Sequence, residues 1–169
     1  MLRSLWRNTL LAFGCWLLAG APGSAAELGV GAVLMATEKS HDPDFTHTVV
    51  VLTQYDRESA VGLMLGKPTD IPITELLPEA KGQRIVVYAG GPLAIGVRGL
   101  VRTKTAPYFR VVTGRAELLR LIARGMPASE FRVYAGYVGW TAQQLHSEVG
   151  RGLWRVEAAD AKAIFEAIH

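Results

Sequence analysis

Short apolar runs separated by polar turns fill most of the chain beyond residue 26. The runs are rich in Val and Leu, and their length and composition favour strands over helices. The second and third runs flank the polar segment Gln54–Ser59 and are expected to form a hairpin. The pattern predicts eight strands, at residues 30–35, 48–53, 61–65, 85–89, 99–102, 109–113, 131–137 and 153–156.

Helical spacing of apolar residues occurs between these strands. In residues 115–124 the apolar side chains form one stripe, and Gly125 ends it. In residues 159–168 apolar positions recur at i, i+3, i+4 and i+7. Residues 68–78 contain three prolines and are expected to form an ordered surface connection with one helical turn at 74–77. Many short strands with helices inserted singly predict an α+β fold with a mixed sheet.

Residues 136–154 hold the most specific local pattern in the chain. Gly136 and Gly139 are expected to turn the backbone after a strand. Thr141, followed three residues later by glutamine, has the spacing of a capping box. The pattern therefore predicts a strand, a turn and a helix that begins at Ala142.

Two tryptophans of this segment are candidates for a binding surface. The apolar face of the predicted helix can pack under Trp140 and Trp154, which would place both rings in the core. An exposed indole would instead stack on a ligand or a partner protein. In that functional interpretation a groove is lined by Trp140, Gln143, Gln144, His146 and Glu148.

The first 26 residues have the layout of a secretory signal. Their apolar run, Leu10–Ala21, would extend about 18 Å as a helix, whereas a hydrocarbon core is about 30 Å thick. We therefore expect cleavage near Glu27 and no stable membrane span. The prediction is a signal peptide at residues 1–26 and a single periplasmic or secreted domain at 27–169. An uncleaved membrane anchor and a misassigned start codon, which would leave the protein in the cytoplasm, are the alternatives.

Cysteine content and charge exclude several classes of function. Cys15 is the only cysteine and lies within the apolar run, where a lipoprotein with Cys15 as its acylated first residue is an alternative to cleavage near Glu27. A domain without it has no disulfide, cysteine nucleophile or thiolate metal site. Because the signal contains Arg3 and Arg7, the domain keeps 16 basic residues against 15 acidic ones. With no basic run either, there is no signal for nucleic-acid binding.

Two further segments were weighed as chemical sites. His41 and Asp42 open a segment with two imidazoles and two carboxylates, but its spacing fits no helical ligand pair and Asp42-Pro43 is a common turn starter. Gly90 and Gly91 follow a strand and could present N–H groups to an anion with help from Arg98. A tight turn with close backbone packing is the alternative there. We predict no metal, no cofactor and no catalytic residue.

Three blocks of the sequence resemble the YqgE/AlgH family of small bacterial proteins, and they keep the family's order. The blocks are Gly31–Pro68 with its Gly62-Leu-Met-Leu-Gly-Lys-Pro68 turn, Gly90-Gly-Pro-Leu93 with Arg98-Gly-Leu-Val101, and Gly136-Tyr-Val-Gly-Trp140 with the residues up to Trp154. The resemblance implies a branched, partly barrel-like β-sheet with helices packed around it. It brings no established catalytic residue. Family members are generally cytoplasmic, and their proposed regulatory role in alginate production is in tension with an export signal.

These observations predict an exported, non-enzymatic domain that binds a protein or a small ligand. The candidate binding surface comprises Gly90, Gly91, Arg98, Trp140 and Gln144. A cytoplasmic or membrane-anchored regulator that retains residues 1–26 is the first alternative. A hydrolase that uses His41 and Asp42 is the second.

Overall fold

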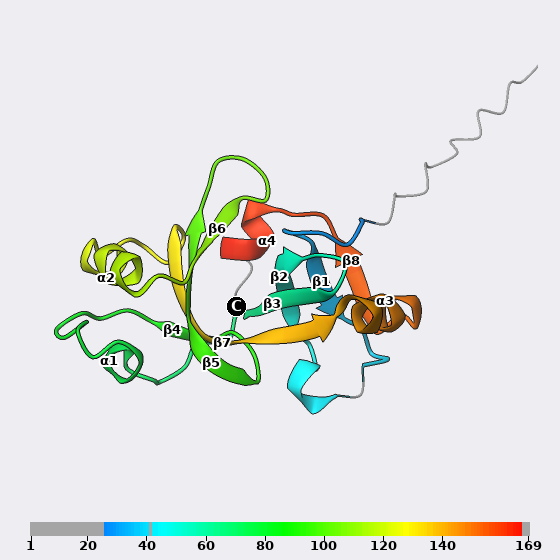
Figure 1. The fold of residues 1–169 in the computed structure, drawn as a ribbon, viewed down its shortest axis with the longest axis horizontal. Coiled ribbons are helices and arrows are strands. Elements are labelled where there is room, and N and C mark those ends of the chain that lie inside the picture. The colour runs from blue at the N-terminus through cyan, green and yellow to red at the C-terminus, as the bar shows by residue number, and fades with distance from the viewer. Residues whose placement is uncertain (1–25, 41, 167–169) are drawn as a thin grey trace, which may run out of the picture.

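One eight-stranded sheet organises the computed structural model, which describes residues 26–40 and 42–166 (Figure 1). The strands run in the order β6-β5-β7-β3-β2-β1-β8, with β4 beside β7 off this path. The β4–β7 pair is parallel and the other pairs are antiparallel, so the sheet is mixed, as predicted. The strands are β1 Val33–Ala36, β2 Val49–Tyr55, β3 Ser59–Leu65, β4 Val87–Ala89, β5 Leu93–Arg102, β6 Phe109–Val112, β7 Phe131–Thr141 and β8 Trp154–Glu157.

Each predicted apolar run overlaps one of these strands, and β2 with β3 forms the predicted hairpin. Strand β5 begins at Leu93, earlier than the predicted start at Gly99. The hairpin turn is held by Asp56, whose Oδ1 accepts hydrogen bonds from the backbone N–H groups of Glu58 and Ser59, both at 2.8 Å. These bonds lower the pKa of Asp56 from 3.8 to about 2, because they favour the ionised carboxylate. The turn is therefore tied together at neutral pH.

The predicted turn at Gly136 and Gly139 is wrong, because β7 continues through both glycines to Thr141. Gly136 has a φ of 73°, which bends the strand without ending it. Before the bend, β7 lies between β4 and β5; after it, residues 138–141 pair with β3. Ladder hydrogen bonds continue on both sides of the bend, so the sheet branches there.

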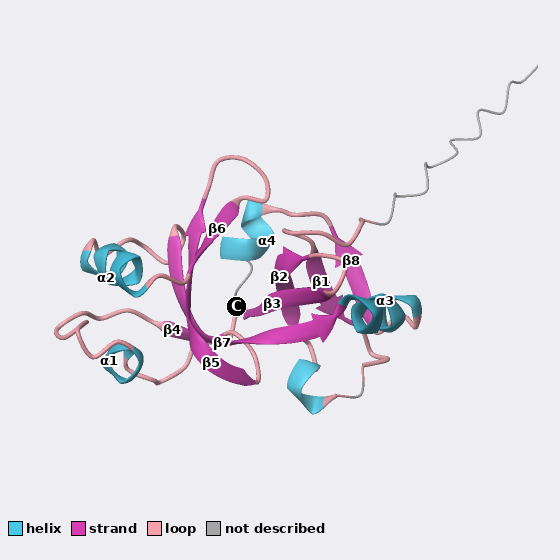
Figure 2. Cartoon of the chain, in the orientation of Figure 1, coloured by secondary structure: helices cyan, strands magenta, loops and turns pink. Residues whose placement is uncertain are grey.

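Four α-helices and one 3-10 helix accompany the sheet in the described part of the chain, and Figure 2 shows α1 and α2 on one side and α3 on the other. The helix after Thr141 begins at Ala142 as predicted, and the Thr141 hydroxyl accepts the Gln144 N–H at 3.1 Å. None of the described helices is long and apolar enough to cross a membrane. The helices are α1 Ile73–Leu76, α2 Arg115–Ala123, α3 Ala142–Gly150, α4 Ala161–Phe165 and η1 Pro43–Phe45.

The core consists of three apolar clusters around the curled sheet. Helices α1 and α2 cover one outer face through residues such as Ile73 and Leu118. Helix α3 covers the other outer face, where Leu145 packs with both tryptophans as predicted. In Figure 1 the strands curve around α4, and its residues Ile164 and Phe165 are almost fully buried among inward-facing side chains. The fold is the predicted α+β arrangement with a partly closed, branched sheet.

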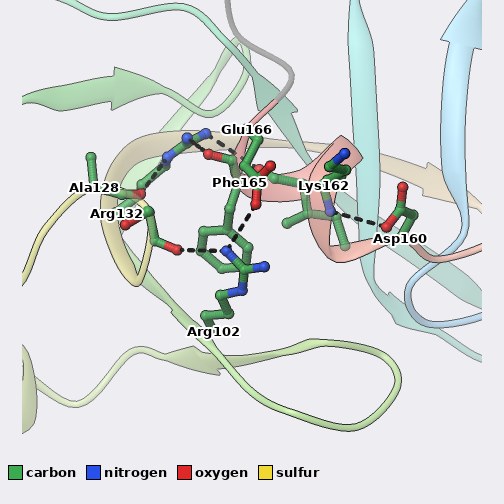
Figure 3. Close-up of polar contacts among 9 residues, drawn as sticks. Arg102, Ala128, Arg132, Asp160, Lys162, Phe165 and Glu166 are labelled. Atoms are coloured by element: carbon green, nitrogen blue, oxygen red, sulfur yellow. Dashed lines mark hydrogen bonds and ion pairs between the residues drawn. The ribbon is translucent and has the colours of Figure 1, made fainter.

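Helix α4 is held inside the curl by Arg132, which is 5% exposed (Figure 3). The Arg132 guanidinium donates to the carbonyl oxygens of Ala128 at 2.9 Å, Ile164 at 3.3 Å and Phe165. Two of these carbonyls lie at the C-terminal end of α4, where a cation interacts favourably with the helix dipole. At the surface, Arg102 Nη1 forms an ion pair with Glu166 at 3.2 Å. The last residues of the predicted helix, 167–169, lie outside the described residues, as do residues 1–25 of the predicted signal.

Candidate functional site

Three elements bring Trp140, Trp154 and Glu148 together: the end of β7, helix α3 and strand β8. The two indole rings meet edge to face, with centroids 5.9 Å apart and an interplanar angle of 87°. Both indole N–H groups donate to Glu148 Oε2, from Trp140 at 3.0 Å and from Trp154 at 2.8 Å. Gln144 Nε2 donates to the other carboxylate oxygen of Glu148 at 3.0 Å. The carboxylate therefore ties α3 to two strands at once.

The tryptophans belong mainly to the core. Trp140 is 6% exposed and Trp154 is 4% exposed, so neither ring offers a free face for stacking. Because both N–H donors are paired with Glu148, the burial leaves no unsatisfied indole group. The rings contribute their edges to a surface depression.

That depression, which we call the tryptophan groove, has a volume of about 450 Å³. Its walls come from α3, from the end of β7, from the segment around η1 and from the start of β5. Leu93 stands at its edge and is 42% exposed, unusual for a leucine in a strand of this sheet. The residues that line the groove and carry the argument below are Lys39, Leu93, Trp140, Gln144, Glu148 and Arg151.

The Gly90-Gly91 segment packs tightly against β7. A β-carbon on Gly90 would overlap the carbonyl oxygen of Gly136, and one on Gly91 would lie 2.6 Å from the backbone nitrogen of Val138. The Gly90 N–H donates to the Ala135 carbonyl oxygen at 2.7 Å, so it is engaged within the sheet and does not face an anion. Close backbone packing therefore explains this glycine pair.

A second hollow of about 260 Å³ adjoins the groove, and Gly91 lines it. Pro92 lines both hollows, so the Gly-Gly-Pro segment separates them and leads into Leu93. Arg98 lies elsewhere: its guanidinium carbon is 4.1 Å from the centroid of the Tyr137 ring. Of the predicted surface, Trp140 and Gln144 share the groove, the glycines lie beside it, and Arg98 is not among its lining residues.

The other candidate residues are scattered. His41 lies outside the described residues, whereas Asp42 lines the groove. His146 is on the exposed side of α3, as predicted, with Nε2 2.7 Å from the Tyr55 hydroxyl oxygen. In the described part of the chain, no group of three or more His, Cys, Asp or Glu side chains is arranged to hold a metal ion.

Sequence reasoning missed several groove residues, among them Lys39, Leu93 and Arg151. Leu93 belonged to a block that resembles a family pattern, but nothing in the sequence distinguished it from a core leucine. Lys39 and Arg151 are isolated cations more than a hundred positions apart in the chain. Only the pairing of β1 with β8 brings their segments together.

Comparison with known proteins agrees with this fold. A family model described as AlgH-like (DUF179) matches residues 33–169. The solution structure of the AlgH protein from Pseudomonas aeruginosa superposes with a TM-score of 0.66 at 24% identity, covering 80% of this chain and 79% of that one. A crystal structure of protein DIP2367 from Corynebacterium diphtheriae has the same TM-score at 23% identity, covering 83% and 81%. These two likenesses establish the fold.

Sequence relatives extend the comparison. A UPF0301 protein of Streptomyces coelicolor is 35% identical over 141 residues, covering 75% of this chain and 73% of the relative. A UPF0301 protein of Ralstonia nicotianae is 32% identical over 148 residues, covering 78% and 77%. The family model, the relatives and the three sequence blocks agree, and the chain belongs to the AlgH-like family of bacterial proteins.

Proposed function

We propose that this protein is an exported, non-enzymatic binding domain that engages a partner through the tryptophan groove. The observation that carries the proposal is that two segments far apart in the sequence, residues 136–154 and residues 90–93, contribute residues to one depression. Residues 140 to 144 supply one wall, and the segment that follows the Gly-Gly pair supplies Leu93 at the edge. A concave, partly apolar depression with a few polar groups is typical of a binding site.

The groove can act as a preformed binding surface, because hydrogen bonds and core packing hold its walls in place. Glu148 links α3 to β7 and β8, and the apolar side of α3 is buried through Leu145. A preorganised surface loses little conformational entropy when a partner binds. The Glu148 carboxylate is held by three donors within the protein, which makes it a structural group and supports a binding role over a catalytic one.

Site-specific cross-linking tests the groove directly. A photo-reactive amino acid at position 93 is expected to give a discrete cross-linked product in cells, because Leu93 borders the groove. The matched control is position 86, since Val86 is 49% exposed but lies outside the groove. Products at neither position, or the same products at both, would contradict the proposal.

Substitutions at exposed groove positions test binding better than substitutions at the buried Trp140 or the tightly packed Gly91. Trp140→Ala would open the core and Gly91→Ala would overlap the backbone of β7, so either change can abolish binding by unfolding. Leu93→Asp leaves the core intact and places a charge at the groove edge. With the photo-reactive residue moved to position 144, where the exposed Gln144 lines the groove, loss of the cross-linked product in Leu93→Asp with unchanged circular dichroism would support the groove as the site.

Export is tested by the mature N-terminus. Mass spectrometry of protein purified from the periplasm is expected to show a start at or near Glu27. A cytoplasmic protein that retains residues 1–26 would overturn export and favour the regulator alternative. The same cross-linking test would still apply to the groove, because its described lining residues lie between Lys39 and Trp154.

A further inference from the structure

Two cations share one end of the tryptophan groove. Lys39 and Arg151 both line it and both are exposed. Their segments are tied together, because the Thr37 hydroxyl donates to the Gly152 carbonyl oxygen at 2.7 Å and the Thr37 N–H donates to the Leu153 carbonyl oxygen at 3.0 Å. A β-carbon on Gly152 would lie 3.4 Å from Lys39 Nζ. The fold thus holds the lysine ammonium next to the residue that follows Arg151.

Neither cation is neutralised by a neighbouring acid. Within the described residues, no carboxylate oxygen lies within 4.0 Å of Lys39 Nζ or of the Arg151 guanidinium. Arg151 Nε donates to the Ser147 carbonyl oxygen of its own helix at 3.4 Å. Two acids, Asp42 and Glu148, also line the groove, and Glu148 accepts its hydrogen bonds from two indoles and Gln144. Two like charges at one end of a groove favour an anionic group between them.

Apolar side chains form much of the rest of the groove, together with the polar residues Ser40, Asp42, Gln144 and Glu148. Leu93 is exposed at the edge, and Phe45 and Leu153 line the groove as partly buried side chains. Pro92 lines both the groove and the second hollow, so a second depression lies next to the groove at the Gly-Gly-Pro segment. A groove with apolar contacts, a cationic end and a second hollow beside it fits a stretch of polypeptide better than a compact ligand.

We infer that the tryptophan groove binds an acidic polypeptide segment that also carries apolar side chains. Its carboxylates pair with Lys39 and Arg151, and an apolar side chain packs on Leu93. This inference rests on the proposed function and adds the chemical class of the partner. It also gives the peptide a polarity, with the acidic side chains at the end formed by α3 and the segment before η1.

The test uses the full chain and dye-labelled pools of short synthetic peptides. In the first pool glutamate alternates with leucine or phenylalanine, and in two matched pools glutamine or lysine replaces glutamate. Fluorescence anisotropy is expected to rank affinity as glutamate above glutamine above lysine, and added salt should weaken the glutamate pool because it screens exposed charges.

Charge reversal assigns the effect to the two cations. K39E/R151E is expected to weaken the glutamate pool about tenfold, because it removes two exposed attractions of up to about 1 kcal/mol each and adds repulsion. The control K81E/R124E changes the net charge equally. Lys81 and Arg124 are both exposed. Arg124 is the C-cap of α2, as Arg151 is the C-cap of α3. Helices α2 and α3 lie on opposite sides of the molecule in Figure 1. This control should leave the affinity unchanged.

The outcomes separate this inference from the proposed function. If the glutamine or lysine pool binds at least as tightly as the glutamate pool, and Leu93→Asp abolishes that binding, the groove is a binding site but the acidic partner is wrong. The inference also fails if K39E/R151E has no more effect than K81E/R124E. If no pool binds in a way that depends on Leu93, the acidic partner is rejected, and the cross-linking experiment alone decides the proposed function.

Discussion

At the scale of single residues, Glu148 determines how the groove is built. An ionised carboxylate accepts several hydrogen bonds, and here it accepts from Trp140, Trp154 and Gln144. The two indole N–H groups would otherwise be buried without partners, which costs free energy. A polar side chain on a helix therefore lets two large aromatic side chains enter the core.

We predict that Glu148→Ala lowers the free energy of unfolding by about 2 to 4 kcal/mol, because two buried indole donors lose their acceptor. Urea denaturation monitored by circular dichroism measures the change. Glu148→Gln is the matched control, since its side-chain oxygen can still accept both N–H groups, and it should lose less than half as much. Equal stability of Glu148→Ala and the parent protein would show that the indoles find other partners.

At the scale of elements, α4 illustrates how a short helix is stabilised from outside. Five residues are too few for a helix to be stable by itself in water, because nucleation is unfavourable. Arg132 supplies donors for the C-terminal carbonyls of α4, while Ile164 and Phe165 fill the inside of the curled sheet (Figure 3). Beneath them lies the Tyr134 hydroxyl, which has no hydrogen-bond partner in the described structure, and burial raises its pKa to about 12. It stays protonated at neutral pH.

Arg132→Met is expected to release α4 while the strands remain folded. The substitution keeps much of the apolar volume but removes all three hydrogen bonds to carbonyl oxygens, and bonds from a charged donor contribute about 1.5 to 3 kcal/mol each. Hydrogen exchange of residues 161–165 should become faster by about tenfold or more, with the central strands little changed. Arg102→Ala removes only an exposed pair and should have a smaller effect. Unchanged protection of α4 in Arg132→Met would contradict this account.

At the scale of the whole molecule, the branch point at β7 joins the two halves of the sheet. There β7 exchanges β4 and β5 for β3, and the Gly90-Gly91 segment crosses against its backbone. The two segments approach so closely that a β-carbon on Gly90, Gly91 or Gly136 would overlap backbone atoms of the facing segment. Positions 90 and 91 therefore require glycine, because larger residues would collide with β7.

Gly91→Ala should lower the free energy of unfolding by more than about 1 kcal/mol, because its β-carbon would lie 2.6 Å from the backbone nitrogen of Val138 and its φ is 152°. The matched control is Gly29→Ala, which has nothing within 4 Å of its β-carbon and should leave stability almost unchanged. Thermal and urea unfolding of the two variants test the difference. Equal stability would mean that the crossing can widen without cost.

Much of the fold could be predicted from local patterns, and the errors have physical causes. Apolar runs located the strands, and Thr141 marked the start of α3. Both predictions succeeded because strand pattern and helix capping depend on residues close together in the sequence. Gly136 was misjudged as a turn, since a glycine with positive φ can equally bend a strand whose ladder bonds continue on both sides. Trp140 and Gln144 were identified as groove residues, whereas Lys39, Leu93 and Arg151 were not.

The sequence by itself determined approximately where strands and helices form, which side of α3 is buried and to which family the chain belongs. These properties follow from side-chain periodicity, capping and short motifs. Only the tertiary structure decided that two tryptophans share one carboxylate, that a glycine pair packs against β7, and that Lys39 and Arg151 meet at one end of a groove. Those arrangements depend on strand pairing between distant segments, which no local spacing encodes.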